Sequence, residues 1–66
     1  MKMSIEEFLE RVEGHPRLEV VHRDGTMCII RYSEASGSRD IRLGFWAVAR
    51  CDWEQLLAAL AIPPDA

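Results

Sequence analysis

Cysteine and histidine are the residues of this chain whose side chains could perform nucleophilic or metal chemistry. The chain has two of each, at Cys28, Cys51, His15 and His22. A cysteine nucleophile needs a base beside its thiol, and no spacing here places a histidine next to either cysteine. The cysteines lack the CxxC spacing of a zinc site and are too few for a secreted disulfide scaffold, and the histidines lack the HxxxH spacing. We therefore predict no catalytic residue, no metal site and no cofactor.

A row of glutamates offers the next candidate chemistry. Glu6, Glu10 and Glu13 recur at helical spacing, which places the first two about 6 Å apart along a helix axis. No apolar neighbour marks any of them as a general acid. The default interpretation is a solvated helix face, and the functional one is a docking surface for a basic protein or a mimic of a nucleic-acid backbone.

The charge balance narrows the classes of partner. Eleven acidic residues against eight basic ones give a net charge of −3. Such a chain has little electrostatic attraction for phosphates, so we expect no direct nucleic-acid binding. No apolar run approaches the roughly 20 residues of a membrane span, and the first residues lack a signal-peptide pattern. We therefore expect no membrane association and a cytoplasmic location.

The length of the chain favours interaction over catalysis. Its 66 residues correspond to one domain, residues 1–66, with flexible tails expected at 1–3 and 63–66. The core of such a small domain rarely contributes more than about 3–5 kcal/mol of stability. Binding to a protein partner or to a second copy would add to this, so a homodimer is one expectation.

Two helices are predicted, one near each end. Ser4 and Glu7 have the spacing of a capping box, and Gly14 with His15-Pro16 should end the first helix. Asp52 and Gln55 have the same spacing before the second helix, and Pro63-Pro64 should close it. Each helix has a single apolar stripe, formed by Ile5, Phe8, Leu9 and Val12 in the first and by Trp53, Leu56, Leu57 and Leu60 in the second.

A β-hairpin is predicted between residues 18 and 32. Asp24-Gly25 is the dipeptide most typical of a type I′ two-residue turn. With those two residues as the loop, Val20 pairs with Ile29 and Val21 with Cys28. The strands then have one face with Leu18, Val20, Met27 and Ile29, and a second face with Val21, Cys28, Ile30 and Tyr32.

The remaining segment completes the predicted fold. Residues 33–39 are small and polar, as in a flexible loop, and residues 41–47 alternate as a third strand with Ile41, Leu43 and Phe45 on the first face. Residues 47–51 could alternatively extend that strand or form a fourth. The predicted fold class is α+β: a single small domain of order α-β-β-β-α, with a three-stranded antiparallel sheet packed with two helices.

The second face of the sheet is the candidate interface. If both helices cover the first face, Ile30, Tyr32 and Trp46 remain partly exposed, and apolar aromatic patches usually mark interfaces. Arg42 lies near them, and arginine is favoured in interfaces, although charged residues also protect sheet edges. If one helix covers each face, these residues are core instead. Both arrangements stay open at this point.

These patterns favour a non-enzymatic protein-binding module that acts by occupying a partner's surface. The candidate partner-binding residues are Glu6, Glu10, Glu13, Ile30, Tyr32, Arg42 and Trp46. The expected partner is another protein, such as a component of a nucleic-acid-handling complex; small acidic prokaryotic or phage inhibitors, anti-CRISPR proteins among them, belong to this class. The alternatives are a homodimeric regulatory domain that binds a small ligand and, third, a thiol-dependent enzyme using Cys51.

Overall fold

The computed structural model describes residues 2–64, and within them the predicted fold class is confirmed. The chain forms a three-stranded antiparallel sheet of strand order β1-β2-β3 together with helices, one of which is a single turn between the last strand and the last helix. In chain order the elements are α1 (Ile5–Gly14), β1 (Leu18–Arg23), β2 (Met27–Glu34), β3 (Gly37–Gly44), α2 (Phe45–Val48) and α3 (Trp53–Ala59).

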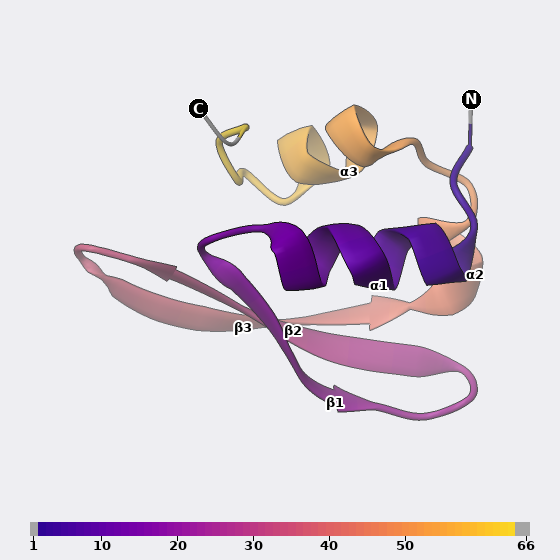
Figure 1. Cartoon of the computed structure of the whole chain (residues 1–66), viewed down its shortest axis with the longest axis horizontal. Coiled ribbons are helices and arrows are strands. Elements are labelled where there is room, and N and C mark those ends of the chain that lie inside the picture. Colours follow the sequence, from indigo (N-terminus) through magenta and orange to yellow (C-terminus); the bar gives the residue numbers. More distant parts are fainter. Residues whose placement is uncertain (1, 65–66) are drawn as a thin grey trace.

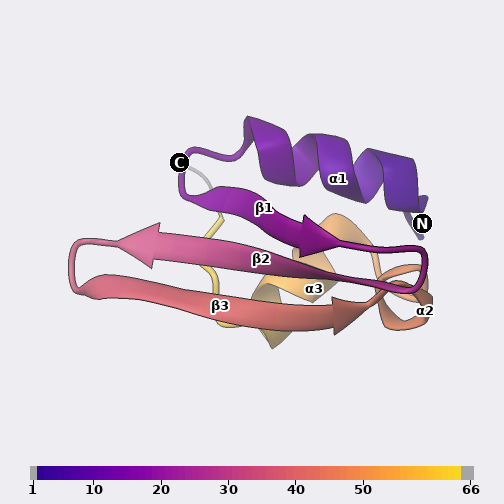
Figure 2. The same ribbon diagram turned by 90° about the horizontal axis from the view of Figure 1, so that it is seen from below.

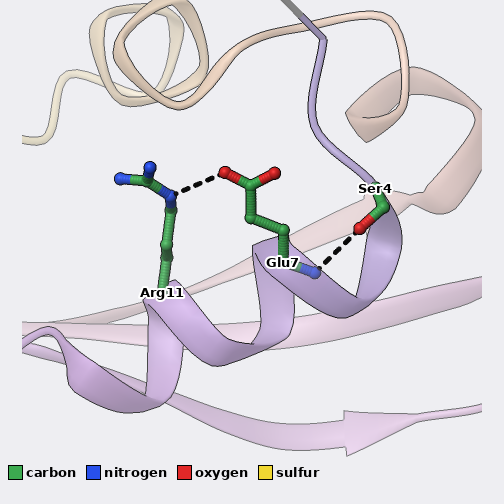
Figure 3. Close-up of polar contacts among 3 residues, drawn as sticks. All are labelled: Ser4, Glu7 and Arg11. Carbon is green, nitrogen blue, oxygen red and sulfur yellow. Dashed lines mark hydrogen bonds and ion pairs between the residues drawn. The ribbon is translucent and has the colours of Figure 1, made fainter.

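Helix α1 begins as its sequence predicts. The Ser4 hydroxyl accepts a hydrogen bond from the backbone N–H of Glu7 at 3.1 Å, which satisfies one free donor of the first turn (Figure 3). The Glu7 carboxylate does not complete the box; it accepts a hydrogen bond from Nε of Arg11 at 3.1 Å, one turn further along. Phe8 and Val12 of the apolar stripe are fully buried.

Both longer helices lie on the same side of the sheet. Figure 1 shows α1 and α3 above the three strands, and Figure 2, the view from below, shows the opposite face of the sheet with α3 behind β2 and β3. Helix α1 runs beside β1. The sheet therefore has a face covered by helices, called here the covered face, and a face without helices, called the open face.

The two faces are not assigned as predicted, because the pairing of β1 with β2 differs. Leu18 pairs with Tyr32 and Val20 with Ile30, and a β-bulge lies between Val20 and His22. A bulge inserts one extra residue, here Val21, and so reverses the side-chain alternation of one strand relative to the other. The predicted pairing of Val20 with Ile29 is wrong for this reason.

The turn before β2 is also displaced. The backbone N–H of Asp24 donates to the carbonyl of Met27 at 3.0 Å, so the loop centres on Gly25 and Thr26. One carboxylate oxygen of Asp24 accepts hydrogen bonds from the Thr26 and Met27 backbone N–H groups and the Thr26 hydroxyl, and these lower the pKa of Asp24. Gly25 does not have a positive φ, so the predicted type I′ turn is wrong.

Strand β3 is longer at its start and shorter at its end than predicted. Glu34 pairs with Gly37, which leaves only Ala35 and Ser36 as the loop where a longer flexible segment was expected. Gly37 takes the positive φ of 134° that the turn requires. At the other end the strand stops at Gly44, and Phe45 begins α2. Residues 47–51 accordingly form neither a strand extension nor a fourth strand.

Helix α3 has a complete cap at each end. Asp52 and Gln55 form the predicted capping box in both directions, at 2.8 and 3.0 Å. At the C-terminus Ala61 adopts φ 56°, and the N–H groups of Ala61 and Ile62 donate back to the carbonyls of Ala58 and Leu57 in a Schellman motif. The guanidinium of Arg39, which lies over the Tyr32 ring, donates to the Leu60 and Ala61 carbonyls and ties this end to β3.

The core lies between the covered face and the helices. Met3 belongs to it: its side chain is buried and its N–H donates to the Cys51 carbonyl at 3.2 Å, so residue 3 is not part of a flexible tail. The tail predictions for residues 1, 65 and 66 lie outside the described residues. The fully buried side chains are Phe8, Val12, Cys28, Ile30, Tyr32 and Val48.

Candidate functional site: the open face of the sheet

The open face combines half-buried apolar side chains with charged ones. Along β2 the burial alternates, with Cys28, Ile30 and Tyr32 buried on the covered face. The residues between them must point to the other side, because successive side chains of a strand alternate. Through the register, the open face includes Met27, Ile29 and Arg31 from β2, Asp40 and Arg42 from β3, and Glu19 and His22 from β1.

An ion pair between adjacent strands orders the centre of this face. Arg31 donates from Nε to Oδ1 of Asp40 at 2.8 Å and from a terminal nitrogen to Oδ2 at 3.2 Å, a bidentate arrangement. The hydrogen bonds from Arg31 lower the pKa of the Asp40 carboxyl. Glu19 lies opposite Arg31 on the other side and further favours the charged guanidinium. A row of alternating charge, Glu19, Arg31 and Asp40, therefore crosses the sheet.

Trp46 is the most exposed large apolar side chain that the described residues include. Its exposed fraction is 71%, against 38% for Val21, the other exposed large hydrophobic residue. A Cβ placed on Gly44 would lie 3.1 Å from the indole Nε1 of Trp46, so the ring lies against Gly44. Gly44 pairs with Met27, and it lies two residues from Arg42 on β3, so a side chain at Gly44 would point to the open face. The indole that lies against this position is therefore at one end of the open face. The Arg50 guanidinium lies 5.8 Å from the ring centroid on top of it.

Two of the predicted interface residues are core residues instead. Ile30 and Tyr32 have exposed fractions of 1% and 2%, so the expectation that they are partly exposed is wrong. The bulge at Val21 is the reason, because it puts them on the same face as Leu18 and Val20. Arg42 and the Trp46 ring, by contrast, lie on the open face.

The acidic row forms a separate surface. Glu6, Glu10 and Glu13 are all exposed on α1. That helix lies on the covered side of the sheet, so these carboxylates do not join Arg42 and Trp46 (Figure 1). Glu13 lines a hollow between α1 and the bulged part of β1, together with Val21.

Met27 and Ile29 are the open-face residues that the sequence prediction misplaced. Both sets of alternating residues in β2 are largely apolar, so hydrophobicity alone does not distinguish its two faces. Arg31 is the residue that could have distinguished them. It lies on the same face of β2 as Met27 and Ile29, and a charged side chain is rarely fully buried. That set of residues therefore belongs on the solvent side.

A second hollow surrounds Trp53. Arg11 lies 5.8 Å from the Trp53 ring centroid, and the imidazole of His15 lies 6.5 Å from it. His15 is buried, its Nδ1 accepts a hydrogen bond from the Arg17 N–H at 3.1 Å, and its Nε2 has no hydrogen-bond partner among the described residues. Since Nε2 is itself covered from solvent, this polar atom is not presented to a ligand in the hollow.

Both cysteines are free thiols, and neither ring nitrogen of the buried His15 bonds to one of them among residues 2–64. Cys28 is fully buried, and burial raises the pKa of its thiol, which disfavours the thiolate that a nucleophile requires. Cys51 is half-buried in the turn before α3. In the same described stretch, no three side chains of His, Cys, Asp or Glu are grouped as a metal ion would require.

Comparison with known proteins gives no family from which a function could be transferred. No protein-family model, no curated protein and no solved structure matches this chain. Within residues 2–64, none of the helices has the length and apolar character needed to cross a membrane.

Proposed function

We propose that this chain is a non-enzymatic protein-binding module that contacts its partner through the open face, with Trp46 as the anchor. The observation that carries the proposal is the 71% exposure of this tryptophan at the end of a sheet face that no helix covers. Tryptophan and arginine are the residue types most enriched among those that dominate binding energy.

The chemistry around Trp46 suits a protein surface. Met27 and Ile29 supply half-buried apolar area next to it, and Arg42 and the Arg31–Asp40 pair supply directional polar contacts. An apolar centre with a polar rim is the usual composition of an interface between proteins. The charge row adds specificity, because a partner must match its alternating signs.

The test compares two exposed apolar residues. Affinity capture from the native host should recover one partner with the wild-type chain and lose it with Trp46→Ser, because the anchor is gone. Val21→Ser is the matched control, since Val21 is also exposed but lines the hollow beside α1. Loss of the partner with Val21→Ser and retention with Trp46→Ser would move the site to the α1 side.

A more specific proposal concerns the cellular compartment and the class of partner. Both cysteines are free, which fits a reducing compartment such as the cytoplasm, where disulfides are rare. The net charge of −3 argues that any nucleic-acid-handling complex is contacted through its protein components. An inhibitor of the anti-CRISPR kind is one form that this would take, and the identity of the captured partner decides it.

A further inference from the structure

We propose that the outer edge of β3 pairs with the same edge of a second copy, so that two chains form one continuous six-stranded sheet. This inference concerns the free edge of β3, which shares Asp40 and Arg42 with the open face but not Trp46, and it does not depend on the proposed function. The sheet has two edges, and they differ. Strand β1 is interrupted by the bulge at Val21 and runs beside α1, whereas β3 pairs regularly with β2 over all eight of its residues. A regular edge strand is a template for another strand.

The hydrogen-bonding pattern determines which backbone groups of β3 face outward. The two-residue loop makes Glu34 and Gly37 a hydrogen-bonded pair, so every second residue from Gly37 onward bonds to β2. The N–H of Phe45 continues the series by donating to the Thr26 carbonyl at 2.9 Å. The free N–H and C=O groups therefore belong to the residues in between, which are Ser38, Asp40 and Arg42, together with the N–H of Gly44, whose carbonyl is at the N-cap of α2.

Charge selects one register for a symmetric antiparallel pair. Two copies can exchange backbone hydrogen bonds only if these outward residues face one another. Centring the two-fold axis on Asp40 puts Asp40 opposite its own copy, and centring it on Arg42 does the same for Arg42. Like charges opposite one another are destabilising. With the axis at Ile41, each Asp40 faces the Arg42 of the other copy, and each Ser38 faces Gly44.

The Ile41-centred register also completes the charge row of the open face. Within one chain the row runs Glu19, Arg31, Asp40 and stops at the free edge. The second copy places its Arg42 next, so that each Asp40 carboxylate lies between two guanidinium groups. On the covered face the two Ile41 side chains, half-buried in the single chain, meet at the axis. In this register residues 38–44 of one copy lie beside residues 44–38 of the other. The two β3 strands therefore overlap over nearly their whole length.

Two reciprocal charge reversals test this proposal. By sedimentation equilibrium, wild type should have the mass of two 7.5 kDa chains, and Asp40→Arg and Arg42→Asp should each fall to the mass of one. An equimolar mixture of the two variants should recover the doubled mass, because both contacts across the axis again join opposite charges. Arg42→Asp leaves the Arg31–Asp40 pair intact, so it remains informative if Asp40→Arg fails to fold in circular dichroism.

Two controls separate the edge from other surfaces. Glu19→Arg reverses a charge on the same face at the far edge of the sheet and should leave the dimer unchanged. Trp46→Ser should also remain a dimer while it loses the captured partner, so failure of either proposal is recognised without the other. A wild-type chain that stays at 7.5 kDa at millimolar concentration overturns the inference, and so does a mixture that stays monomeric while wild type dimerises.

Discussion

The two faces of the sheet differ in how their side chains are stabilised. On the covered face Ile30 and Tyr32 are almost completely removed from water by α1, α3 and their neighbours. On the open face Met27, Ile29 and Arg31 are each only partly buried, and Arg31 forms an exposed ion pair with Asp40. The covered face therefore supplies most of the free energy of folding, because that term follows apolar area removed from water. The side chains of the open face can therefore be changed with less loss of stability, as the proposed binding surface would require.

Adjacent residues of β2 give the sharpest test of this difference. Ile30→Ala should cost about 2–5 kcal/mol in the free energy of unfolding, because it leaves a cavity in a fully packed core. Ile29→Ala, next in sequence and on the open face, should cost about 1 kcal/mol or less. Urea denaturation followed by circular dichroism measures both. Equal costs would show that the open face is covered in solution.

A substitution at the C-terminal end of α3 should stabilise the fold. Ala61 holds a left-handed conformation that glycine adopts without a Cβ penalty. Ala61→Gly should therefore raise the free energy of unfolding by about 0.5–1 kcal/mol, the relief of strain being partly offset by the greater freedom of glycine in the unfolded chain. Ala59→Gly, inside the same helix, is the matched control and should destabilise by a similar amount. A lower melting temperature for Ala61→Gly would contradict the cap.

The contact between Gly44 and Trp46 probes the open face directly. Gly44→Ala places a methyl group about 3.1 Å from the indole, so the exposed ring must shift slightly. We expect less than about 0.5 kcal/mol of lost stability, because Gly44 has an ordinary negative φ and the ring is free to move. The change should appear as altered acrylamide quenching of tryptophan fluorescence. Gly14→Ala, where nothing lies near the added Cβ, should leave the quenching unchanged.

Acid should weaken the open face by a smaller amount. The Asp40 pKa is lowered from 3.8 in the folded chain by its hydrogen bonds from Arg31. A lowered carboxyl pKa contributes stability that is present above the unfolded value and is lost as pH falls through the folded value. The melting temperature of wild type should thus exceed that of Asp40→Asn at neutral pH, and the gap should narrow as the pH falls below the unfolded value of 3.8. A gap independent of pH would mean that the ion pair does not contribute.

The local elements could be predicted because their signals are local. The caps at Ser4 and Asp52 lie within three residues of their partners, and both helices begin where those residues indicate. The apolar stripes of the helices and the core positions Leu18, Ile41 and Leu43 also follow from simple periodicity.

The assignment of the two faces failed at one residue. Moving the turn from Asp24-Gly25 to Gly25-Thr26 shifts the pairing by two and leaves every side chain on its predicted face. The bulge at Val21 adds a further single-residue shift, and this reverses β2 relative to β1. No residue type marks a bulge reliably, so Ile30 and Tyr32 were expected in the interface and Met27 and Ile29 in the core. The short helix at Phe45–Val48 was missed because four residues are too few to display a helical period.

The rate at which the Cys28 thiol is alkylated can report how often this chain unfolds. Its thiol has no exposed surface at the centre of the sheet, and it lies beneath the helices on the covered face. An alkylating reagent can reach it only when the sheet and helices separate, so in the native state the labelling rate is set by the population of opened molecules. Cys51, half-buried in a turn, should label first and serve as the reference within the same molecule. Mass spectrometry of the two thiols would then report opening in dilute samples and crude extracts, with and without a bound partner.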